Sequence, residues 1–394
     1  MQNTTAMSDI LIIGAGPVGS FTARALATKG YRVTVLEKRS RLGDPVCCAG
    51  IISPDCLGVL GGKEFPVLNS FEGARVFSPA GQTLELKRSR VQAVALDRGM
   101  MDMKLAEQAN LAGARYVFGY KASHIETDDS GVNVYADSRQ ETCYRAQLLL
   151  IAAGFNPVLT NKLGMGKPAD FATGVQARVE IKPSLPLCIF TSNNFAPGFF
   201  SWLEPLGDGS ALAGLLCRKN AAVGFARYIK YLLNHGFITS AEKPQFRGVS
   251  LSPLSKTYSN RMLVLGDSAG QVKPITGGGV FYGLKGARCA ISQAEKAFAT
   301  GDFTASSLAG YQNGWKTVLG KDIQLGQIGR KIYEKLSDHQ IDKAFRAVAR
   351  NGLADRLAAN NDLQFDDHGR VVLKILKMPA FYQTVGMTLL PELK

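Results

Sequence analysis

The sequence predicts an α/β (α+β) protein in which a nucleotide-binding domain is interrupted by β-rich segments. A strand, a glycine turn, a helix and a second strand follow one another in residues 10–37, which is the order of a βαβ unit. Apolar strands return at residues 143–152 and 262–265, and the second of these runs into a glycine-rich segment and a helix. Between them, residues 165–255 consist mostly of strand-like pieces separated by Gly and Pro.

The glycine turn of the βαβ unit predicts a Rossmann-like dinucleotide site. In "IIGAGPVGS", Gly14, Gly16 and Gly19 have the GxGxxG spacing, with Ala15 inside the turn. The first glycine permits the tight turn, the second lets the backbone approach a pyrophosphate, and the third lets the helix pack closely on the strand. The helix N-terminus offers free amides and the positive end of its dipole to the phosphates. Glu37 ends the second strand and is placed to accept hydrogen bonds from a ribose without a 2′-phosphate.

Three further segments follow in the order expected of the same domain. "LVLGDSAGQVKPITGGG" takes a strand into Asp267 and then into a glycine loop, and a helix opens at Gly279 and Val280. "LLLIAAG" ends a strand at Gly154, and a helical pattern begins at Arg98, which can flank a cofactor or be a solvated helix cap. This order resembles that of flavoproteins with a two-dinucleotide-binding fold, in which an Asp in this position binds the ribityl chain. The resemblance implies that the dinucleotide is FAD.

These patterns predict a discontinuous domain organisation. From about Ser306 onward the apolar residues have helix-face spacing, which indicates a helical C-terminal region. The chain of 394 residues is long enough to bury sizeable cores. The predicted domains are an FAD-binding domain at residues 1–65, 96–165 and 255–300, a β-rich substrate-binding domain at residues 66–95 and 166–254, and a C-terminal helical domain at residues 301–394.

Composition and charge narrow the classes of function. The seven cysteines form neither a CxxC pair nor a Cys/His cluster, so we expect thiols in a reducing compartment and no metal site. The chain has no apolar run of about 18 residues and no apolar signal-peptide core at its start, so we expect a cytoplasmic protein. The net charge is +14, but the basic residues are dispersed and we expect no nucleic acid partner. The basic surface suits acidic lipid headgroups or an acidic electron-transfer protein.

The stretch "PGFFSWLEPLGDGSALAG" has two interpretations. Alternating side chains of a strand put Phe200, Trp202 and Glu204 on one face. Flat aromatic side chains suit the wall of a site for a long apolar ligand, which gains affinity from buried apolar area. The alternative is that they fill the core of the β-rich domain. A charge at Glu204 would be costly there unless it is paired or solvated.

The whole chain resembles the geranylgeranyl reductase family, in particular the archaeal-type branch that saturates the isoprenoid chains of digeranylgeranylglycerophospholipids. This branch belongs to the group with the p-hydroxybenzoate hydroxylase fold. "GDSAGQVKPITGGG" matches the reductase pattern, and "DPVCCAGI" is similar to the family's Pro-x-x-Cys-Ala segment facing the flavin. The family's aromatic motif, Tyr-x-Trp-x-Phe-Pro, is matched at Phe200, Trp202 and Pro205, whereas Glu204 replaces the usual Phe.

The resemblance implies a set of site residues. The prenyl chain would lie against Phe200, Trp202 and Pro205. Cys48, or Cys47 if the loop is shifted by one, would donate a proton or hold the substrate; both can also be small hydrophobes in a tight loop. The implied FAD-binding residues are Gly14, Ala15, Gly16, Gly19, Glu37, Cys48, Ala49, Arg98, Ala122, Asp267, Gly279 and Val280.

The sequence therefore predicts an FAD-dependent reductase that saturates double bonds of geranylgeranyl chains, in membrane lipids or their precursors. The alternatives are an aromatic-ring monooxygenase of the same fold, which would have a histidine where Gly270 stands, and a non-catalytic flavin- or lipid-binding protein. A geranylgeranyl lipid, a free diphosphate, a quinone tail and a chlorophyll side chain all remain as substrates. A ferredoxin-like protein or NAD(P)H would supply electrons. The basic and apolar segment 371–390 either packs as core or rests on the inner face of a membrane.

Overall fold

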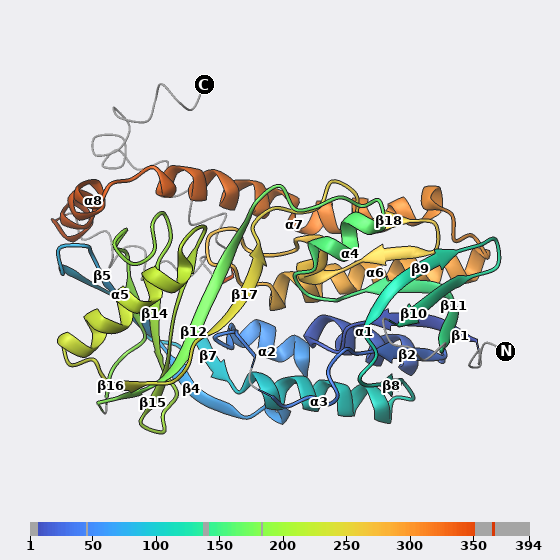
Figure 1. Cartoon of the computed structure of the whole chain (residues 1–394), viewed down its shortest axis with the longest axis horizontal. Helices are drawn as coiled ribbons and strands as arrows, with labels where there is room; N and C mark the ends of the chain where they lie inside the picture. Colours follow the sequence, from blue (N-terminus) through green and yellow to red (C-terminus); the bar gives the residue numbers. More distant parts are fainter. Residues whose placement is uncertain (1–6, 45, 137–141, 183, 351–364, 367–394) are drawn as a thin grey trace. The chain divides into compact units, whose positions relative to one another are not determined.

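The computed structural model describes residues 7–44, 46–136, 142–182, 184–350 and 365–366 (Figure 1). The chain forms two compact units, and each is assembled from separate parts of the sequence. The first unit comprises Met1–Pro45, Arg98–Asp170 and Ser250–Lys321, and the second comprises Val46–Asp97, Phe171–Val249 and Asp322–Lys394.

The first unit is built on a sheet with a parallel centre, in the order β18-β19-β11-β1-β2-β8. All neighbours in this order pair in parallel except β18 and β19. The chain runs from β1 to one side, while β11 lies on the other, so the carboxyl end of β1 is the kind of switch point at which such sheets bind ligands. The strands are β1 (Ser8–Ile13), β2 (Val33–Leu36), β8 (Arg115–Val117), β11 (Cys143–Ile151), β18 (Tyr258–Ser259) and β19 (Met262–Val264).

Helices pack around this sheet because its central strands are apolar on both faces. Residues 10–13 of β1 and 148–151 of β11 are buried. Helix α1 (Pro17–Thr28) has Pro17 at its first position, where the missing N–H costs nothing, and packs against α3 (Arg98–Leu111) and α6 (Val280–Thr300). The unit also contains α4 (Pro157–Lys162), the 3₁₀ turn η2 (Gly266–Ala269) and the beginning of α7 (Ala305–Glu334).

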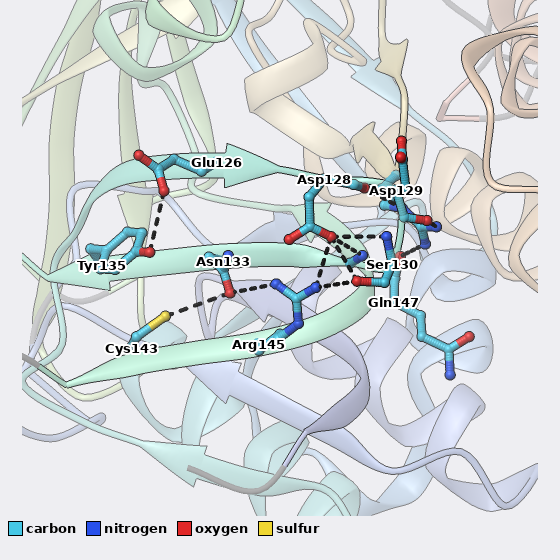
Figure 2. Close-up of polar contacts among 11 residues, drawn as sticks. Glu126, Asp128, Asp129, Ser130, Asn133, Tyr135, Cys143, Arg145 and Gln147 are labelled. Carbon is cyan, nitrogen blue, oxygen red and sulfur yellow. Dashed lines mark hydrogen bonds and ion pairs between the residues drawn. The ribbon is translucent and has the colours of Figure 1, made fainter. Parts of the chain in front are cut away.

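An antiparallel meander, β9 (Ala122–Thr127) and β10 (Val132–Ala136), extends the first unit's sheet from β11. Figure 2 shows that Arg145 ties its turn: Nη2 donates to Asp128 Oδ1 at 2.7 Å and Nη1 donates to Asn133 Oδ1 at 2.9 Å. The backbone N–H of Ser130 also donates to Asp128. The hydrogen bond from Arg145, and to a smaller extent that from Ser130, holds the pKa of Asp128 well below its ordinary value. The charges of Arg145 and Asp128 therefore satisfy each other.

The second unit is built on a mostly antiparallel sheet in the order β16-β12-β15-β14-β13-β5-β6, with β17 also paired to β12. Helix α5 (Ala221–Asn234) packs on β12 and β15 through its buried residues Phe225, Tyr228 and Leu232. The strands are β5 (Gly73–Phe77), β6 (Thr83–Lys87), β12 (Phe171–Ile181), β13 (Cys188–Phe190), β14 (Ser201–Pro205), β15 (Ser210–Cys217), β16 (Ile238–Ala241) and β17 (Gln245–Ser250).

A smaller sheet in the second unit, β3-β7-β4, completes its core. Phe71 of β4 and Ala95 of β7 form a buried cluster with Leu187 and Leu206 of the larger sheet's segments. The remaining elements are β3 (Ile51–Ile52), β4 (Val67–Phe71), β7 (Ala93–Leu96), α2 (Pro54–Leu60), the 3₁₀ turn η1 (Gly62–Glu64) and α8 (Asp338–Arg350).

The predicted α/β (α+β) class is confirmed, but two segments are grouped differently from the predicted domains. Residues 46–65 lie in the second unit, because β3 pairs with β7 and β7 pairs with β4. After residue 300, the chain through Lys321 groups with the first unit and the described residues from Asp322 group with the second, so the division falls inside α7. Segment 371–390 lies outside the described residues.

Candidate functional site

The three glycines of the turn after β1 have different surroundings. Gly14 has φ of +103°, and a Cβ there would lie 2.4 Å from the carbonyl oxygen of Ala152. A Cβ at Gly19 would lie 1.9 Å from the carbonyl oxygen of Gly14, so α1 packs on the turn at a distance that only glycine permits. Gly16, the N-cap of α1, has nothing within 4 Å of its Cβ position. The helix N-terminus is therefore open where it can receive a phosphate group.

Val18 joins this turn to the second glycine-rich segment. A Cβ at Gly266 would approach Val18 Cγ2 to 3.1 Å, and a Cβ at Gly283 would approach it to 2.5 Å. Gly266 follows β19 and begins η2, whereas Gly283 lies in the first turn of α6. The packing of α1 on α6 thereby brings the N-termini of both helices to the carboxyl end of the parallel strands.

Asp267 lies against the N-terminus of α6. A Cβ at Gly279 would approach Asp267 Oδ1 to 2.1 Å, so a side chain at this position would displace the carboxylate. Gly270 has φ of +72°, and its Cβ would lie 2.2 Å from the carbonyl oxygen of Ser252. A histidine, as expected in a monooxygenase of this fold, does not fit at position 270 without a change in the backbone.

Glu37 is a buried carboxylate at the end of β2, with 4% of its surface exposed. Its Oε2 accepts the N–H of Ala15 at 2.8 Å, and its Oε1 accepts the N–H and the Nε of Arg39, both at 3.0 Å. Glu37 thus fastens the glycine turn to the second strand. A carboxylate oxygen has two lone-pair sites, so Oε2 keeps the capacity to accept a ribose hydroxyl.

Arg98 begins α3 and is buried. Its Nη2 donates to Asp102 Oδ1 at 2.8 Å, and the other carboxylate oxygen of Asp102 lies 3.7 Å from Arg39. Glu37, Arg39, Asp102 and Arg98 therefore form a row of alternating charges within the first unit. The interpretation of Arg98 as a solvated helix cap is wrong, because the guanidinium is buried and paired.

The cysteine loop lies on the sheet of the second unit. Cys47 Sγ donates to the carbonyl oxygens of Gly174 on β12, at 3.8 Å, and Gln245 on β17, at 3.5 Å. Burial raises the pKa of the Cys47 thiol to about 11, so this thiol keeps its proton at neutral pH. The carbonyl oxygen of Cys48 accepts a hydrogen bond from Nε2 of Gln176 at 3.3 Å. Ala49 follows in the same loop and is half-buried.

The aromatic stretch divides into core and half-buried residues. Phe199 is buried, with the Arg330 guanidinium 3.5 Å from its ring centroid and its carbonyl oxygen accepting the Tyr333 hydroxyl at 3.0 Å. The core interpretation is therefore correct for Phe199. Phe200 and Trp202 are half-buried, and their ring centroids lie 6.1 Å apart.

Trp202 lies across the neighbouring strand at Gly214. The two residues are direct register partners, and a Cβ at Gly214 would lie 2.3 Å from Cζ2 and 2.5 Å from Cε2 of the indole. Gln176 is the partner of Gly214 on the other side. Gly214 therefore leaves the space that the indole occupies between β14 and Gln176.

Glu204 follows Trp202 by two residues on β14, so both side chains lie on the same face. Glu204 has 0% of its surface exposed, and neither carboxylate oxygen has a hydrogen-bond partner among the described residues. Burial, with a smaller contribution from Cys48, raises the pKa of Glu204 well above its ordinary value. Burial thus favours the protonated form of this side chain, which avoids the cost of a buried charge.

The other predicted site residues lie at element ends. Val280 opens α6, and Ala122 opens β9, half-buried against the first unit's core. Pro205 ends β14, where its carbonyl oxygen accepts Asn69 Nδ2 at 2.9 Å. The predicted cofactor-binding residues of the first unit, and Cys48 and Trp202 of the second unit, are thus each held by local packing.

Three residues of the sites were not predicted. Val18 looks like an ordinary helix residue, since only the structure reveals the two glycines packed on it. Gly214 could have been recognised from the sequence, because an isolated glycine inside a strand pattern indicates that another group approaches the backbone closely. The sequence indicated Gln176 more weakly, as a polar residue in the otherwise mostly apolar strand "GVQARV".

No helix in the described part of the chain is long and apolar enough to cross a membrane. No group of His, Cys, Asp and Glu side chains in the described ranges is arranged to hold a metal ion.

Comparisons with known proteins agree with the fold and the glycine motifs. The family model described as FAD dependent oxidoreductase matches residues 9–63. A digeranylgeranylglycerophospholipid reductase of Methanosarcina acetivorans is 31% identical over 360 residues, which cover 85% of this chain and 86% of that protein. The Methanocaldococcus jannaschii protein of the same name is 28% identical over 364 residues, covering 88% and 92%.

Solved structures share the fold over nearly the whole chain. A geranylgeranyl bacteriochlorophyll reductase-like protein from Thermoplasma acidophilum superposes with a TM-score of 0.83 at 21% identity, covering 99% of both chains. The halogenase PltM superposes with a TM-score of 0.68 at 13% identity, covering 96% of this chain and 94% of that one. The predicted fold, a Rossmann-like domain with an antiparallel sheet domain and C-terminal helices, is confirmed.

The parallel sheet, its glycine turn and the matched family model define the fold of FAD-dependent oxidoreductases. Within that class, the chain belongs to the geranylgeranyl reductase family.

Proposed function

We propose that this protein is an FAD-dependent reductase that saturates carbon–carbon double bonds of geranylgeranyl chains. The observation that carries the proposal is the similarity, over most of both chains, to proteins named as digeranylgeranylglycerophospholipid reductases. Two structural features support it: a first unit suited to a dinucleotide, and an aromatic face beside a cysteine loop in the second unit.

The residues of the first unit fit FAD. The open space at Gly16 suits the pyrophosphate, and Glu37 has acceptor capacity for the adenosine ribose. Asp267 and Gly279 are packed together as a ribityl-binding carboxylate and a helix N-terminus would be. Reduced FAD, when bound, would supply hydride to the substrate's double bond.

The second unit supplies a proton to accompany the hydride. Saturation of an isolated double bond needs one hydride and one proton, added to its two carbon atoms. Cys47 keeps its thiol proton at neutral pH because burial raises its pKa to about 11. Cys48, which the family resemblance aligns with the flavin-facing cysteine, is the first candidate for the donor, and Cys47 is the second.

Phe200, Trp202 and Pro205 form the proposed contact for the prenyl chain. Half-buried aromatic rings present flat apolar surface, and a prenyl chain gains affinity chiefly by burying such surface. The net charge of +14 suits an acidic ferredoxin-like electron donor, with NAD(P)H as the alternative. The same charge supports contact with anionic lipid at the inner membrane face.

An anaerobic single-turnover experiment tests the function. The purified flavoprotein is reduced with dithionite, digeranylgeranylglycerophospholipid is added, and the lipid mass and the flavin spectrum are followed together. We expect lipid mass to increase in steps of two hydrogens as the flavin reoxidises. Unchanged lipid over hours would refute this substrate, and oxygen consumption with an aromatic acid would favour the monooxygenase.

Cysteine variants locate the proton donor in the same assay. We expect Cys48→Ala to slow flavin reoxidation by at least about tenfold, within the range of general acid catalysis. Cys289→Ala is the matched control, since Cys289 is a half-buried cysteine of α6 in the first unit. Equal rates for both variants would transfer the role to Cys47 or to water.

A further inference from the structure

A group of polar atoms on one face of the second unit's sheet has no protein partner among the described residues. The atoms are Nε1 of Trp202, both carboxylate oxygens of Glu204 and Oε1 of Gln176, and each is shielded from solvent. Buried polar groups are nearly always hydrogen-bonded, so a cluster of unpartnered ones demands an explanation.

The strand register gathers these atoms. Gln176 and Trp202 flank Gly214 in one row, at about 5 Å per strand. Two indole atoms, Cζ2 and the Cε2 that is bonded to Nε1, lie over Gly214, in the row that Gln176 shares. Glu204 occupies the next position on the same face of β14, about 7 Å along the strand.

The cysteine loop fixes the orientation of the amide. Gln176 Nε2 donates to the carbonyl oxygen of Cys48 at 3.3 Å, which leaves Oε1 as the group without a partner. Cys48 is also the neighbour that acts electrostatically on Glu204. The three polar side chains therefore lie in one region, beside the loop in which the proposed proton donor is found.

The donors and acceptors select the chemistry of a ligand. The indole N–H can only donate, the amide oxygen can only accept, and a carboxyl does both when it is protonated. A phosphate or carboxylate group accepts only and carries charge. Arg178, the cation that the register places in the row of Glu204, is already paired with Asp208 at 2.5 Å. A carbonyl cannot donate to the amide oxygen, whereas one hydroxyl can donate to the amide oxygen and accept from both the indole N–H and the carboxyl O–H.

We infer that Glu204, Trp202 and Gln176 bind an alcohol hydroxyl of the prenyl substrate. This inference rests on the proposed function, and it narrows the substrate to a geranylgeranyl compound with a free hydroxyl beside the aromatic face, such as a prenyl alcohol or digeranylgeranylglycerol, in place of a phospholipid that lacks one. Glu204 is the residue that determines this specificity, because the family motif has an apolar Phe at its position.

Matched ligands test the inference without turnover. The full-length flavoprotein is titrated calorimetrically with micellar geranylgeraniol and with its methyl ether, which has the same chain but cannot donate a hydrogen bond. We expect the alcohol to bind at least about tenfold more tightly. Digeranylgeranylglycerol and its methyl ether are titrated in parallel; a preference within either pair supports the inference and identifies whether the hydroxyl belongs to a prenyl alcohol or to glycerol.

Variants assign the preference to these side chains. Glu204→Met and Trp202→Phe are expected to reduce the preference to less than about threefold, whereas Glu204→Gln, which still donates and accepts, keeps most of it. Glu180→Met is the matched control, an exposed glutamate of β12 in the same sheet. Flavin content and thermal melting verify that each variant is folded.

The outcomes separate this inference from the proposed function. Equal affinity for alcohol and ether, or no binding of the alcohol, overturns the inference, because the polar atoms would then be satisfied by water. Reduction of the prenyl chain is followed separately by mass spectrometry. A preference for the alcohol without any chain reduction would overturn the proposed function and leave the hydroxyl site standing.

Discussion

Two buried glutamates, one in each unit, have opposite surroundings. Glu37 accepts three hydrogen bonds, from Ala15 and Arg39, and belongs to a row of paired charges. Glu204 has no hydrogen-bond partner in the described part of the chain and lies on a sheet face beside an indole. The first carboxylate is part of the folded framework, whereas the second is available to something that is not part of the protein. Burial alone therefore does not distinguish a structural acid from a binding acid, whereas the presence or absence of hydrogen-bond partners does.

The largest expected effect comes from breaking the turn that Glu37 fastens. In Gly19→Ala the new Cβ would lie 1.9 Å from a backbone oxygen, so we expect a loss of at least about 4 kcal/mol or no folded protein. Urea denaturation measures this loss in the free energy of unfolding. Gly16→Ala is the matched control: its Cβ meets nothing within 4 Å, so it should fold within about 1 kcal/mol of wild type but bind FAD more weakly. Similar stabilities for both variants would contradict the different roles of the two glycines.

Removing Glu37 itself is expected to cost less, but still a large fraction of the stability. Glu37→Ala leaves the buried N–H of Ala15 without its acceptor and Arg39 without its nearest carboxylate. We expect a loss of about 2–4 kcal/mol and weaker retention of FAD. Urea denaturation of the flavin-free protein isolates the first effect. A loss below about 0.5 kcal/mol would mean that water replaces the carboxylate without cost.

Removing Glu204 is expected to increase the stability of the protein, in contrast to the two changes above. Glu204→Met replaces an unpartnered buried acid with an apolar side chain of similar length, so we expect a gain of about 1–3 kcal/mol in the same denaturation experiment. The inferred hydroxyl preference would be lost as stability rises, which is the usual trade at a binding site. A destabilised Glu204→Met would show that the acid has a partner in the folded protein.

The smallest effect is a pH dependence that belongs to Glu204. Burial raises its pKa in the folded state above the ordinary value of 4.5. The folded state therefore binds a proton that the unfolded state releases, and the stability present below pH 4.5 is lost as pH rises toward the folded pKa. Cys48 adds a smaller electrostatic contribution to the raised pKa of Glu204. We expect the melting temperature of Glu204→Gln to equal that of wild type near pH 4 and to exceed it increasingly up to pH 8. A constant difference would mean that Glu204 does not change its protonation on unfolding.

The first unit was more predictable from sequence than the second. Its glycine spacing, acid and strand order reflect local backbone requirements, and Gly14 and Gly19 meet the close contacts that the motif implies. Arg98 could be assigned to a helix start, but its burial and its pair with Asp102 depend on tertiary packing. In the second unit, the sequence indicated that Glu204 and Trp202 share a face. It could not reveal Gln176 as their neighbour, because that proximity arises from pairing between strands distant in sequence.

The interleaving of the two units constrains how the chain can be made. Strand β1 is synthesised well before its partner β11 and the next strand β19, which lie at Cys143–Ile151 and Met262–Val264. Between them the ribosome delivers most of the strands of the other unit. Neither unit can finish folding before α7 has emerged, so apolar strand edges stay exposed throughout translation. No contiguous fragment of the chain corresponds to one of its units.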